Sequence, residues 1–218
     1  MIELYSANTP NGIKVPIALE ELGVEYRLIT VNLAADEQKQ PAFLSLNPNG
    51  RIPLLVDFST PDGVPLNLAE SGAILLYLAQ TYGGLLPDDF RPRQRAMEYL
   101  FLQVASIGPM FGQAGWFLRS AAQPIPVAID RFRNESLRLT ALLEARLQKH
   151  PWLAGDEYSL ADIMHFSWLH IAHYAGIDLA RFPALSAWVA TINARPAVQR
   201  ALARFQNRSI GSNAMKQP

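Results

Sequence analysis

The stretch that decides the fold is Ser45–Asp57, which reads S-L-N-P-N-G-R-I-P-L-L-V-D. Four turn-forming residues at 47–50 lead directly into an apolar run at 52–56. Pro53 stands inside that run, and because proline has no N–H for a strand ladder, it marks an edge, a strand start or a cis peptide bond. Only about 5–6% of X-Pro bonds in folded proteins are cis, so this stretch alone favours a trans bond.

The elements expected around this stretch favour the cis bond instead. A strand at 2–5, a helix that ends at Leu22 and a strand at 26–33 precede it, and a hairpin turn at 61–63, another strand and a helix follow it. This order resembles that of a thioredoxin-like domain, and the resemblance implies a cis proline at the head of the third strand that turns the preceding peptide group toward a ligand. We therefore expect Pro53 to be cis and Ile52 to offer its backbone to a peptide-like ligand, as in strand addition to a sheet edge.

Composition and charge exclude several classes of protein. The 218 residues include 19 Lys and Arg and 19 Asp and Glu, so the basic excess of a nucleic-acid-binding or anionic-membrane-binding chain is absent. No apolar run reaches the roughly 18–20 residues of a membrane span. The first residues lack the pattern of a secretory signal, so we expect a cytoplasmic protein with neither nucleic acid nor membrane as a partner.

The chain contains no cysteine. Disulfide bonds, thiolate metal sites and a protein-borne catalytic thiol are therefore excluded, and any reactive thiol must arrive with a ligand. The four histidines show no spacing typical of metal ligands, so we expect no metal.

The hydrophobic pattern changes after the first 80 residues. We predict a thioredoxin-like domain at 1–82, a linker at 83–91, an all-α domain at 92–208 and a tail at 209–218. In the helical half, Gly108 and Pro109 should bend a long helix, and Ser159 with Asp162 should form a capping box. In the first half, Pro16 lies awkwardly inside the first helix, which predicts an irregular first turn or a late helix start.

These strings, taken together and in order, resemble the glutathione transferase family, over residues 1 to about 208. The detail is most similar to the bacterial Nu class and its fungal nitrogen-regulator relatives. The strings that carry the resemblance are T-P-N-G at 9–12, E-E-L-G at 20–23, N-P-N-G-R-I-P at 47–53, E-S-G-A-I-L-L-Y-L at 70–78, G-P-M-F-G-Q at 108–113 and Y-S-L-A-D-I at 158–163.

The resemblance implies a site for the γ-glutamyl end of glutathione at Glu70 and Ser71. The hydroxyl of Ser71 and the N–H groups of the helix start would hold the α-carboxylate, and Glu70 would accept hydrogen bonds from the ammonium. Residues of these types are also common at an ordinary helix start, where glutamate favours the positive end of the helix dipole. The presence of Pro53 upstream, at the family's spacing, favours the ligand site.

The resemblance also implies that Thr9 donates a hydrogen bond to the glutathione sulfur, with help from Asn11. One or two such bonds at a helix N-terminus would lower the thiol pKa from its usual value of about 8.5. Two alternatives stay open: Asn11 suits the role of a helix N-cap, and Ser6 is another hydroxyl donor nearby.

Two further residues complete the implied binding site. Gln38 matches a glutamine that binds the glycyl carboxylate of glutathione, where Lys39 and Arg51 offer positive charge. Arg131 matches an arginine that contacts a second glutathione or glutathione disulfide. Without a ligand, Gln38 would be a solvated loop amide and Arg131 a surface charge, as is common for residues of these types.

The fold and family together predict a glutathione-dependent enzyme that is a homodimer. The Nu-class resemblance favours reduction of a disulfide substrate by the thiolate of bound glutathione. Two alternatives are conjugation of glutathione to an electrophilic carbon and a regulatory protein that binds glutathione without catalysis. The regulatory fungal relatives carry Asn-rich segments, and this chain has none.

Overall fold

A computed structural model describes residues 1–206, which form two compact units. One unit consists of residues 1–83 with 195–206, and the other consists of residues 84–194. The last helix therefore belongs with the first unit. The predicted boundaries at 82, 91 and 208 divide the chain differently and stay predictions. The predicted tail lies outside the described residues. No helix within residues 1–206 has both the length and the hydrophobicity that a membrane crossing needs.

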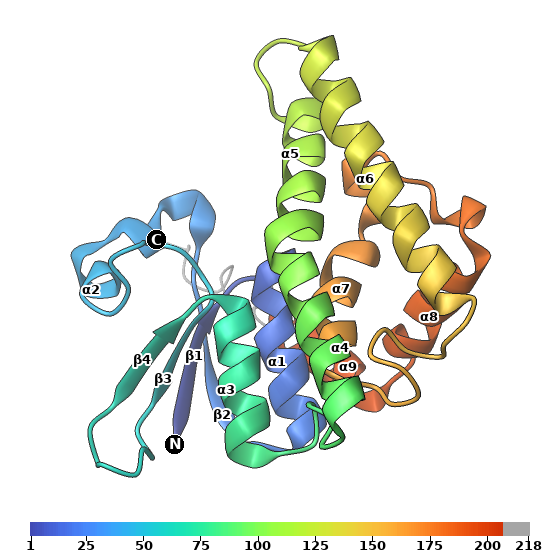
Figure 1. The fold of residues 1–218 in the computed structure, drawn as a ribbon. Helices are drawn as coiled ribbons and strands as arrows, with labels where there is room; N and C mark the ends of the chain where they lie inside the picture. The colour runs from blue at the N-terminus through green and yellow to red at the C-terminus, as the bar shows by residue number, and fades with distance from the viewer. Residues whose placement is uncertain (207–218) are drawn as a thin grey trace. The chain divides into compact units, whose positions relative to one another are not determined.

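The first unit is built on a four-stranded sheet (Figure 1). Its strands, in the spatial order β2-β1-β3-β4, are β2 (Tyr26–Thr30), β1 (Ile2–Ser6), β3 (Leu54–Asp57) and β4 (Leu66–Ala69). β1 pairs in parallel with β2 and antiparallel with β3, and β4 pairs antiparallel with β3. The predicted hairpin between β3 and β4 is confirmed. The strand that follows Pro53 is not an edge strand, as strand addition would require, because β1 and β4 cover both of its sides.

Helices cover both faces of this sheet. Helices α1 (Pro10–Leu22) and α3 (Ser71–Tyr82) lie together over one face (Figure 1), and the short α2 (Pro41–Leu44) lies over the other. Phe43 of α2 is buried in a cluster with Leu54 and Val56 of β3, two alternate residues that share a face of the pleated strand. Two 3-10 turns, at Leu33–Ala35 and Glu37–Lys39, connect β2 to α2.

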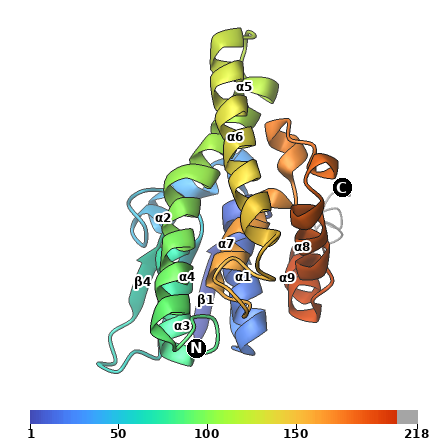
Figure 2. The ribbon, with the colours of Figure 1, turned by 45° about the vertical axis from the view of Figure 1, so that its right-hand side comes forward.

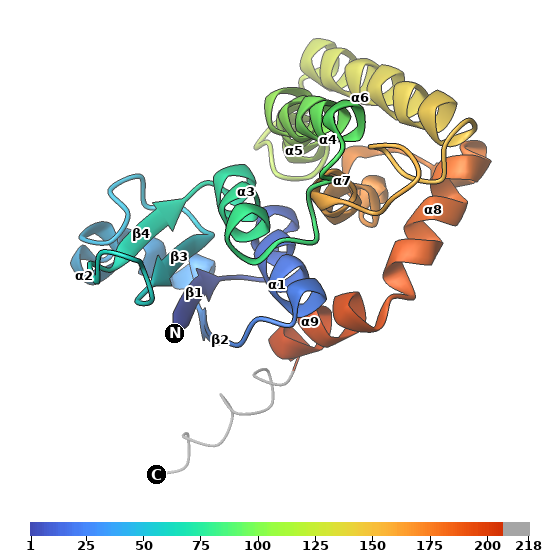
Figure 3. The ribbon, with the colours of Figure 1, turned by 60° about the horizontal axis from the view of Figure 1, so that its bottom comes forward.

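The last helix, α9 (Pro196–Gln206), lies along α1 (Figure 3). Two ion pairs join its arginines to the end of α1: Arg200 Nε lies 2.9 Å from a carboxylate oxygen of Glu20, and Arg204 Nε lies 2.7 Å from the other. Arg195, just before α9, pairs with Glu21 at 2.6 Å. Sequence periodicity does not reveal this placement, because α9 is separated from α1 by more than 170 residues.

Residues 84–194 contain helices and no strand (Figure 2). The helices are α4 (Phe90–Leu102), α5 (Gly108–Arg119), α6 (Pro126–Leu147), α7 (Leu160–Leu169) and α8 (Pro183–Asn193), with 3-10 turns at Ala172–Ala175 and Leu179–Arg181. The break expected at Gly108 takes the form of a π-helical segment, Gln103–Ile107, that joins α4 to α5. The predicted fold class, a thioredoxin-like domain and an all-α domain, is confirmed.

The capping box at the start of α7 is also confirmed. The Ser159 hydroxyl accepts from the helix, and Asp162 Oδ2 accepts from the Ser159 N–H at 3.0 Å. The other oxygen of Asp162 accepts from the Leu153 N–H and from Trp188 Nε1, both at 3.0 Å. All ten residues of α7 are buried, so this one carboxylate fixes the central helix of the unit to α8 and to the preceding loop.

Pro16 lies in the interior of α1, which begins at Pro10, so the predicted late start is wrong. A residue other than proline at position 16 would donate its N–H to the carbonyl of Gly12, four residues earlier. That carbonyl instead accepts a 2.8 Å hydrogen bond from the hydroxyl of Ser6, which is fully buried at the end of β1. The serine therefore satisfies the acceptor that the proline leaves unpaired.

We expect Ser6→Ala to lower the free energy of unfolding by about 1–3 kcal/mol, because it leaves a buried carbonyl without a donor. In a Pro16→Ala background, residue 16 regains its N–H and can pair with Gly12, so the same serine substitution should cost much less. Denaturant unfolding of the four proteins in this double-mutant cycle measures the difference. An equal cost in both backgrounds would show that Ser6 does not replace the missing donor.

Candidate functional site

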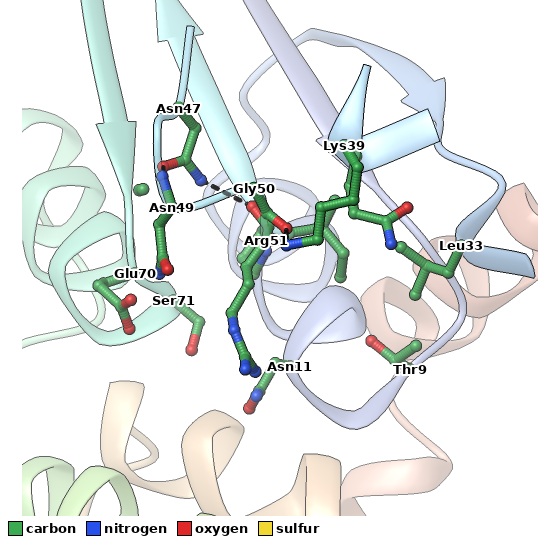
Figure 4. A pocket seen from close by; sticks show the side chains of 14 residues that line it. Thr9, Asn11, Leu33, Lys39, Asn47, Asn49, Gly50, Arg51, Glu70 and Ser71 are labelled. Carbon is green, nitrogen blue, oxygen red and sulfur yellow. Dashed lines mark hydrogen bonds between the residues drawn. The ribbon is translucent and has the colours of Figure 1, made fainter. Parts of the chain in front are cut away.

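One cavity of about 600 Å³ in the first unit gathers most of the predicted site residues. Its walls come from the N-terminal ends of α1 and α3, the residues before β3, and the segment between β2 and α2 (Figure 4). Seven of the eight predicted residues line it: Thr9, Asn11, Gln38, Ile52, Pro53, Glu70 and Ser71. The loops at one end of the sheet therefore bring together residues that are up to 62 positions apart in the sequence.

The Ile52–Pro53 peptide bond is cis, as predicted. Pro53 is buried and Ile52 is half-buried at the wall of the cavity. The pairings of β3 with both neighbours begin at Leu54, so the backbone of Ile52 lies just beyond the sheet ladder. β3 therefore offers a ligand the backbone of Ile52 beyond the ladder, and not a whole strand edge.

Glu70 and Ser71 lie where β4 gives way to α3, and both side chains point into the cavity (Figure 4). Glu70 has φ 70° and ψ 114°, a conformation that residues with a Cβ rarely adopt and that typically costs about 1–3 kcal/mol. Its exposed carboxylate makes no capping hydrogen bond to the helix, whereas Ser71 is 7% exposed. A strained backbone that presents an uncommitted carboxylate is typical of a functional site.

Thr9 and Asn11 line the cavity from the start of α1. Thr9 is the N-cap of this helix, because its Oγ1 accepts the N–H of Gly12 at 3.1 Å. The alternative assignment of Asn11 as the cap is wrong: Asn11 is exposed in the first turn, and its Oδ1 accepts from the side chain of Lys14 at 2.8 Å. As a cap, the Thr9 hydroxyl is an acceptor toward the helix, and its own proton is left for another partner.

Ser6, the other candidate hydroxyl, does not line the cavity. It is fully buried, and its single proton is donated to Gly12. The geometry therefore removes Ser6 as a donor to a ligand sulfur.

Lys14 is a site residue that the sequence reasoning missed. It is 1% exposed, and its Nζ lies 2.8 Å from Asn11 Oδ1 and 3.4 Å from Ser71 Oγ, so it joins the two helix starts beneath the cavity. Burial lowers the pKa of Lys14 from 10.5 to about 7, and the negative charge of Glu70 opposes that change. A lysine within the buried stripe of α1, three residues after Asn11, was the available sequence signal.

Gln38, Lys39 and Arg51 also line the cavity. Gln38 Nε2 donates to Asp36 at 3.2 Å, while its buried Oε1 has no hydrogen-bond partner among residues 1–206. Lys39 Nζ donates to the carbonyl of Gly50 at 2.8 Å, and the exposed Arg51 side chain extends into the cavity (Figure 4). Lys39 and Arg51 thus give the cavity two cations that suit an anionic group of a ligand.

Arg131, the eighth predicted residue, lies on α6 in the second unit. It lines a different cavity, of about 430 Å³, with Met110, Asn134, Glu135 and Arg138. Its assignment to a second glutathione stays a prediction. Residues 1–206 contain no cluster of three or more histidine or acidic side chains that could hold a metal ion.

Comparison with known proteins points to one family. The model of the glutathione S-transferase N-terminal domain matches residues 1–80, and that of the C-terminal domain matches residues 111–196. The disulfide-bond oxidoreductase YfcG of Escherichia coli is 46% identical over 207 residues, which cover 94% of this chain and 96% of the relative.

Two solved structures are similar over most of this chain. A glutathione transferase family member from Pseudomonas fluorescens, with two glutathione bound, is 40% identical, with a TM-score of 0.87 and 92% of each chain covered. A glutathione transferase from Pseudomonas putida, with one glutathione disulfide bound per subunit, is 41% identical, with a TM-score of 0.88 and coverage of 92% of this chain and 90% of the other.

The buried amine predicts a specific dependence of stability on pH. Unfolded Lys14 keeps its proton until about pH 10, whereas the folded protein releases it near pH 7. Between these values the unfolded state binds the additional proton, so this residue makes the free energy of unfolding rise with pH by up to about 1.4 kcal/mol per pH unit. Below pH 7 Lys14 is protonated in both states, so the free energy of unfolding has lost all of this gain and no longer changes with pH through this residue.

We therefore expect Lys14→Met to gain stability relative to the parent as the pH falls from 10 to 7. Denaturant unfolding across this range, with the exposed Lys149→Met as the matched control, measures the difference. If the free energy of unfolding changes with pH in the same way in the parent and in Lys14→Met, the buried amine has an ordinary pKa.

Proposed function

The chain belongs to the glutathione S-transferase family, and we propose that it binds glutathione in the cavity of the first unit and uses it to reduce disulfides. The observation that carries the proposal is the convergence of seven predicted residues on one cavity. The carboxylate of Glu70 and the start of α3 lie on one side of the cavity, Lys39 lies on another, and the Arg51 side chain lies between them (Figure 4).

The γ-glutamyl group binds at Glu70 and Ser71. Its ammonium donates to the Glu70 carboxylate, which no helix N–H occupies, and its α-carboxylate accepts from the Ser71 hydroxyl and the first N–H groups of α3. The cysteinyl residue pairs with the backbone of Ile52, beyond the end of the ladder. The glycyl carboxylate then lies near Gln38 and the cations of Lys39 and Arg51.

The glutathione sulfur lies between Thr9 and Asn11. The Thr9 hydroxyl proton is available because the hydroxyl acts as an acceptor toward Gly12, and Asn11 lines the same cavity two residues further along the chain. Hydrogen bonds to a thiolate stabilise it relative to the thiol and lower the thiol pKa. Since the chain has no cysteine, the protein orients and activates a thiol that belongs to its ligand.

The reaction is a pair of thiol–disulfide exchanges. The thiolate of bound glutathione attacks one sulfur of a disulfide, a mixed disulfide forms, and the other sulfur leaves as a thiolate that takes a proton from solvent. A second glutathione thiolate attacks the glutathione sulfur of the mixed disulfide, which gives glutathione disulfide and the second product thiol. Two glutathione molecules supply the two electrons, and the relatives with two glutathione or one glutathione disulfide bound support this stoichiometry.

A comparison of three measurements tests the function. We expect turnover of a small dialkyl disulfide with glutathione, slow conjugation of a chloronitrobenzene, and saturable glutathione binding. Conjugation without disulfide reduction would make the chain a conjugating transferase. Binding without either activity would support the regulatory alternative, and the absence of binding would overturn the site itself.

We expect Glu70→Gln to weaken glutathione binding by about 1–3 kcal/mol, the usual scale of a hydrogen bond to a charged group, because it removes the negative charge opposite the ammonium. Calorimetric titration with glutathione measures this. The matched control is Glu25→Gln, an exposed glutamate outside the cavity lining, which should bind as the parent does. Parental affinity in Glu70→Gln would return Glu70 to the role of an ordinary helix-start residue.

Thr9 should affect both rate and stability, since it is a cap and a sulfur donor. We expect Thr9→Val to lower the disulfide reduction rate by more than tenfold, to move the alkaline rise of the pH–rate profile to higher pH, and to cost about 1 kcal/mol of stability. Thr9→Ser keeps both hydrogen-bonding roles and should retain most of the rate. Binding of glutathione should change little in either variant, because the other contacts to the tripeptide remain.

Asn11→Ala separates the two donors. A small loss of rate with a parental pH profile would make Thr9 the main donor, whereas an inactive Asn11→Ala beside a fully active Thr9→Val would reverse the roles. Full activity in both variants would contradict the assignment of the sulfur site.

A further inference from the structure

We propose that Asn49 binds the γ-glutamyl group of glutathione, and that its side-chain oxygen accepts a hydrogen bond from the ligand's ammonium beside Glu70. The inference deepens the proposed function and rests on it, since it takes glutathione as the ligand of the cavity. It adds a residue that sets the preference for a γ-glutamyl amine.

Asn49 lies on the same side of the cavity as the proposed γ-glutamyl site. The ladder between β3 and β4 ends at Leu54 and Ala69, so the turn at 47–50 and Glu70 both lie beyond the same end of the sheet. Figure 4 shows the side chain of Asn49 extending from this turn toward the side where Glu70 lies, and both residues line the cavity. A ligand group held by Glu70 is therefore a neighbour of the Asn49 amide.

The fold makes no use of the Asn49 side chain. It is exposed, and it forms no hydrogen bond with any residue in the described part of the chain. Asparagine is common in turns because it tolerates a positive φ and because its side chain bonds the backbone nearby. Within residues 1–206 the non-glycine residues with a positive φ are Asp36 and Glu70, and the positive φ of this turn, 60°, belongs to Gly50. The turn therefore does not require asparagine at position 49.

Other groups hold the turn that carries Asn49. The buried side chain of Asn47 accepts from the Asn49 N–H at 3.1 Å and donates to the Arg51 carbonyl at 2.7 Å. The N–H of Gly50 donates to the Asn47 carbonyl at 2.9 Å, and Lys39 Nζ donates to the Gly50 carbonyl at 2.8 Å. These bonds fix the backbone of Asn49, so a ligand has to order only a short side chain, at a small cost in entropy.

The needs of the ligand group decide which end of the amide it meets. An ammonium has three N–H donors and no acceptor, and among the described residues that line the cavity Glu70 alone has a carboxylate. The α-carboxylate already has donors in the Ser71 hydroxyl and the N–H groups at the start of α3. The group still lacks an acceptor, and Oδ1 of Asn49 provides one without adding a second negative charge beside Glu70.

The test is calorimetric titration of the parent and Asn49→Ala with three thiol ligands. These are glutathione, an analogue with a glutaryl group in place of γ-glutamyl, which lacks the amine, and a 4-aminobutanoyl analogue, which lacks the α-carboxylate. We expect Asn49→Ala to weaken binding of glutathione and of the 4-aminobutanoyl analogue by about tenfold, the scale of one hydrogen bond to a charged group. Binding of the glutaryl analogue should not change. The matched control, Asn67→Ala, removes an exposed asparagine of β4 outside the cavity lining and should bind all three ligands as the parent does.

Three outcomes would overturn the proposal. A loss confined to the two ligands with an α-carboxylate would show that Asn49 donates to that group. An equal loss for all three ligands would show that the substitution acts through the turn. Parental binding of glutathione would show that Asn49 does not contact it.

Asn49→Asp separates the two ends of the amide without a change of shape. It keeps an acceptor and removes the donor, so glutathione should bind at least as tightly as to the parent, and weaker binding would contradict the inferred role. Both variants should keep the parental free energy of unfolding, because the exposed side chain makes no hydrogen bond within residues 1–206.

Failure of this inference and failure of the proposed function are distinguishable, because the titrations need no disulfide. Disulfide turnover by a parent whose glutathione affinity is insensitive to Asn49 supports the reaction and overturns the inference. The expected pattern across the three ligands, in a protein that reduces no disulfide, overturns the reaction and supports the inference.

Discussion

The hydrogen bond from Ser6 to the carbonyl of Gly12 is the constraint on which the site depends. It ties the last residue of β1 to the first turn of α1 across the three-residue loop at 7–9, and it replaces the bond that Pro16 removes from the helix. The loop can then pass so close to the helix that a Cβ at Gly12 would lie 2.0 Å from the carbonyl of Ala7. Thr9 lies on this loop and caps the same helix. Its hydroxyl is therefore fixed in place by the hydrogen bond that it accepts from the N–H of Gly12.

The polarity of the cavity follows from what surrounds it. In the proposed complex a ligand thiolate and two ligand carboxylates need donors, and two helix starts and two cations offer them from separate parts of the sequence. Glu70 is the exception, and its strained backbone turns a carboxylate into the cavity, where it suits an ammonium. The absence of cysteine from this chain is compatible with a disulfide-bond oxidoreductase among its relatives, because the reactive sulfur can come with the ligand.

Sequence reasoning failed where long-range packing decides the local role of a residue. The strand after Pro53 was predicted as an edge, but β4 pairs along its open side and leaves only the peptide group of Ile52 beyond the ladder. Asn11 suits an N-cap by residue type, but the backbone reaches its capping geometry two residues earlier, at Thr9. Both errors concern partners that are fixed by hydrogen bonds and not by hydrophobic periodicity.

The sequence by itself determined the fold class, the cis bond before Pro53, the capping box of α7 and seven residues that share one cavity. The fold class and the capping box follow from local signals, since turn chemistry, caps and periodicity act within a few residues and together select one order of elements. The cis bond follows from the resemblance of that order to a thioredoxin-like domain, and the site residues are those that the resemblance to the glutathione transferase family implies. Only the tertiary structure decided that Lys14 lies beneath the cavity and that Ser6 serves the helix. The burial and partners of a polar side chain depend on elements far away in the chain, here α3 for the lysine, and a pattern within one helix contains no information about them.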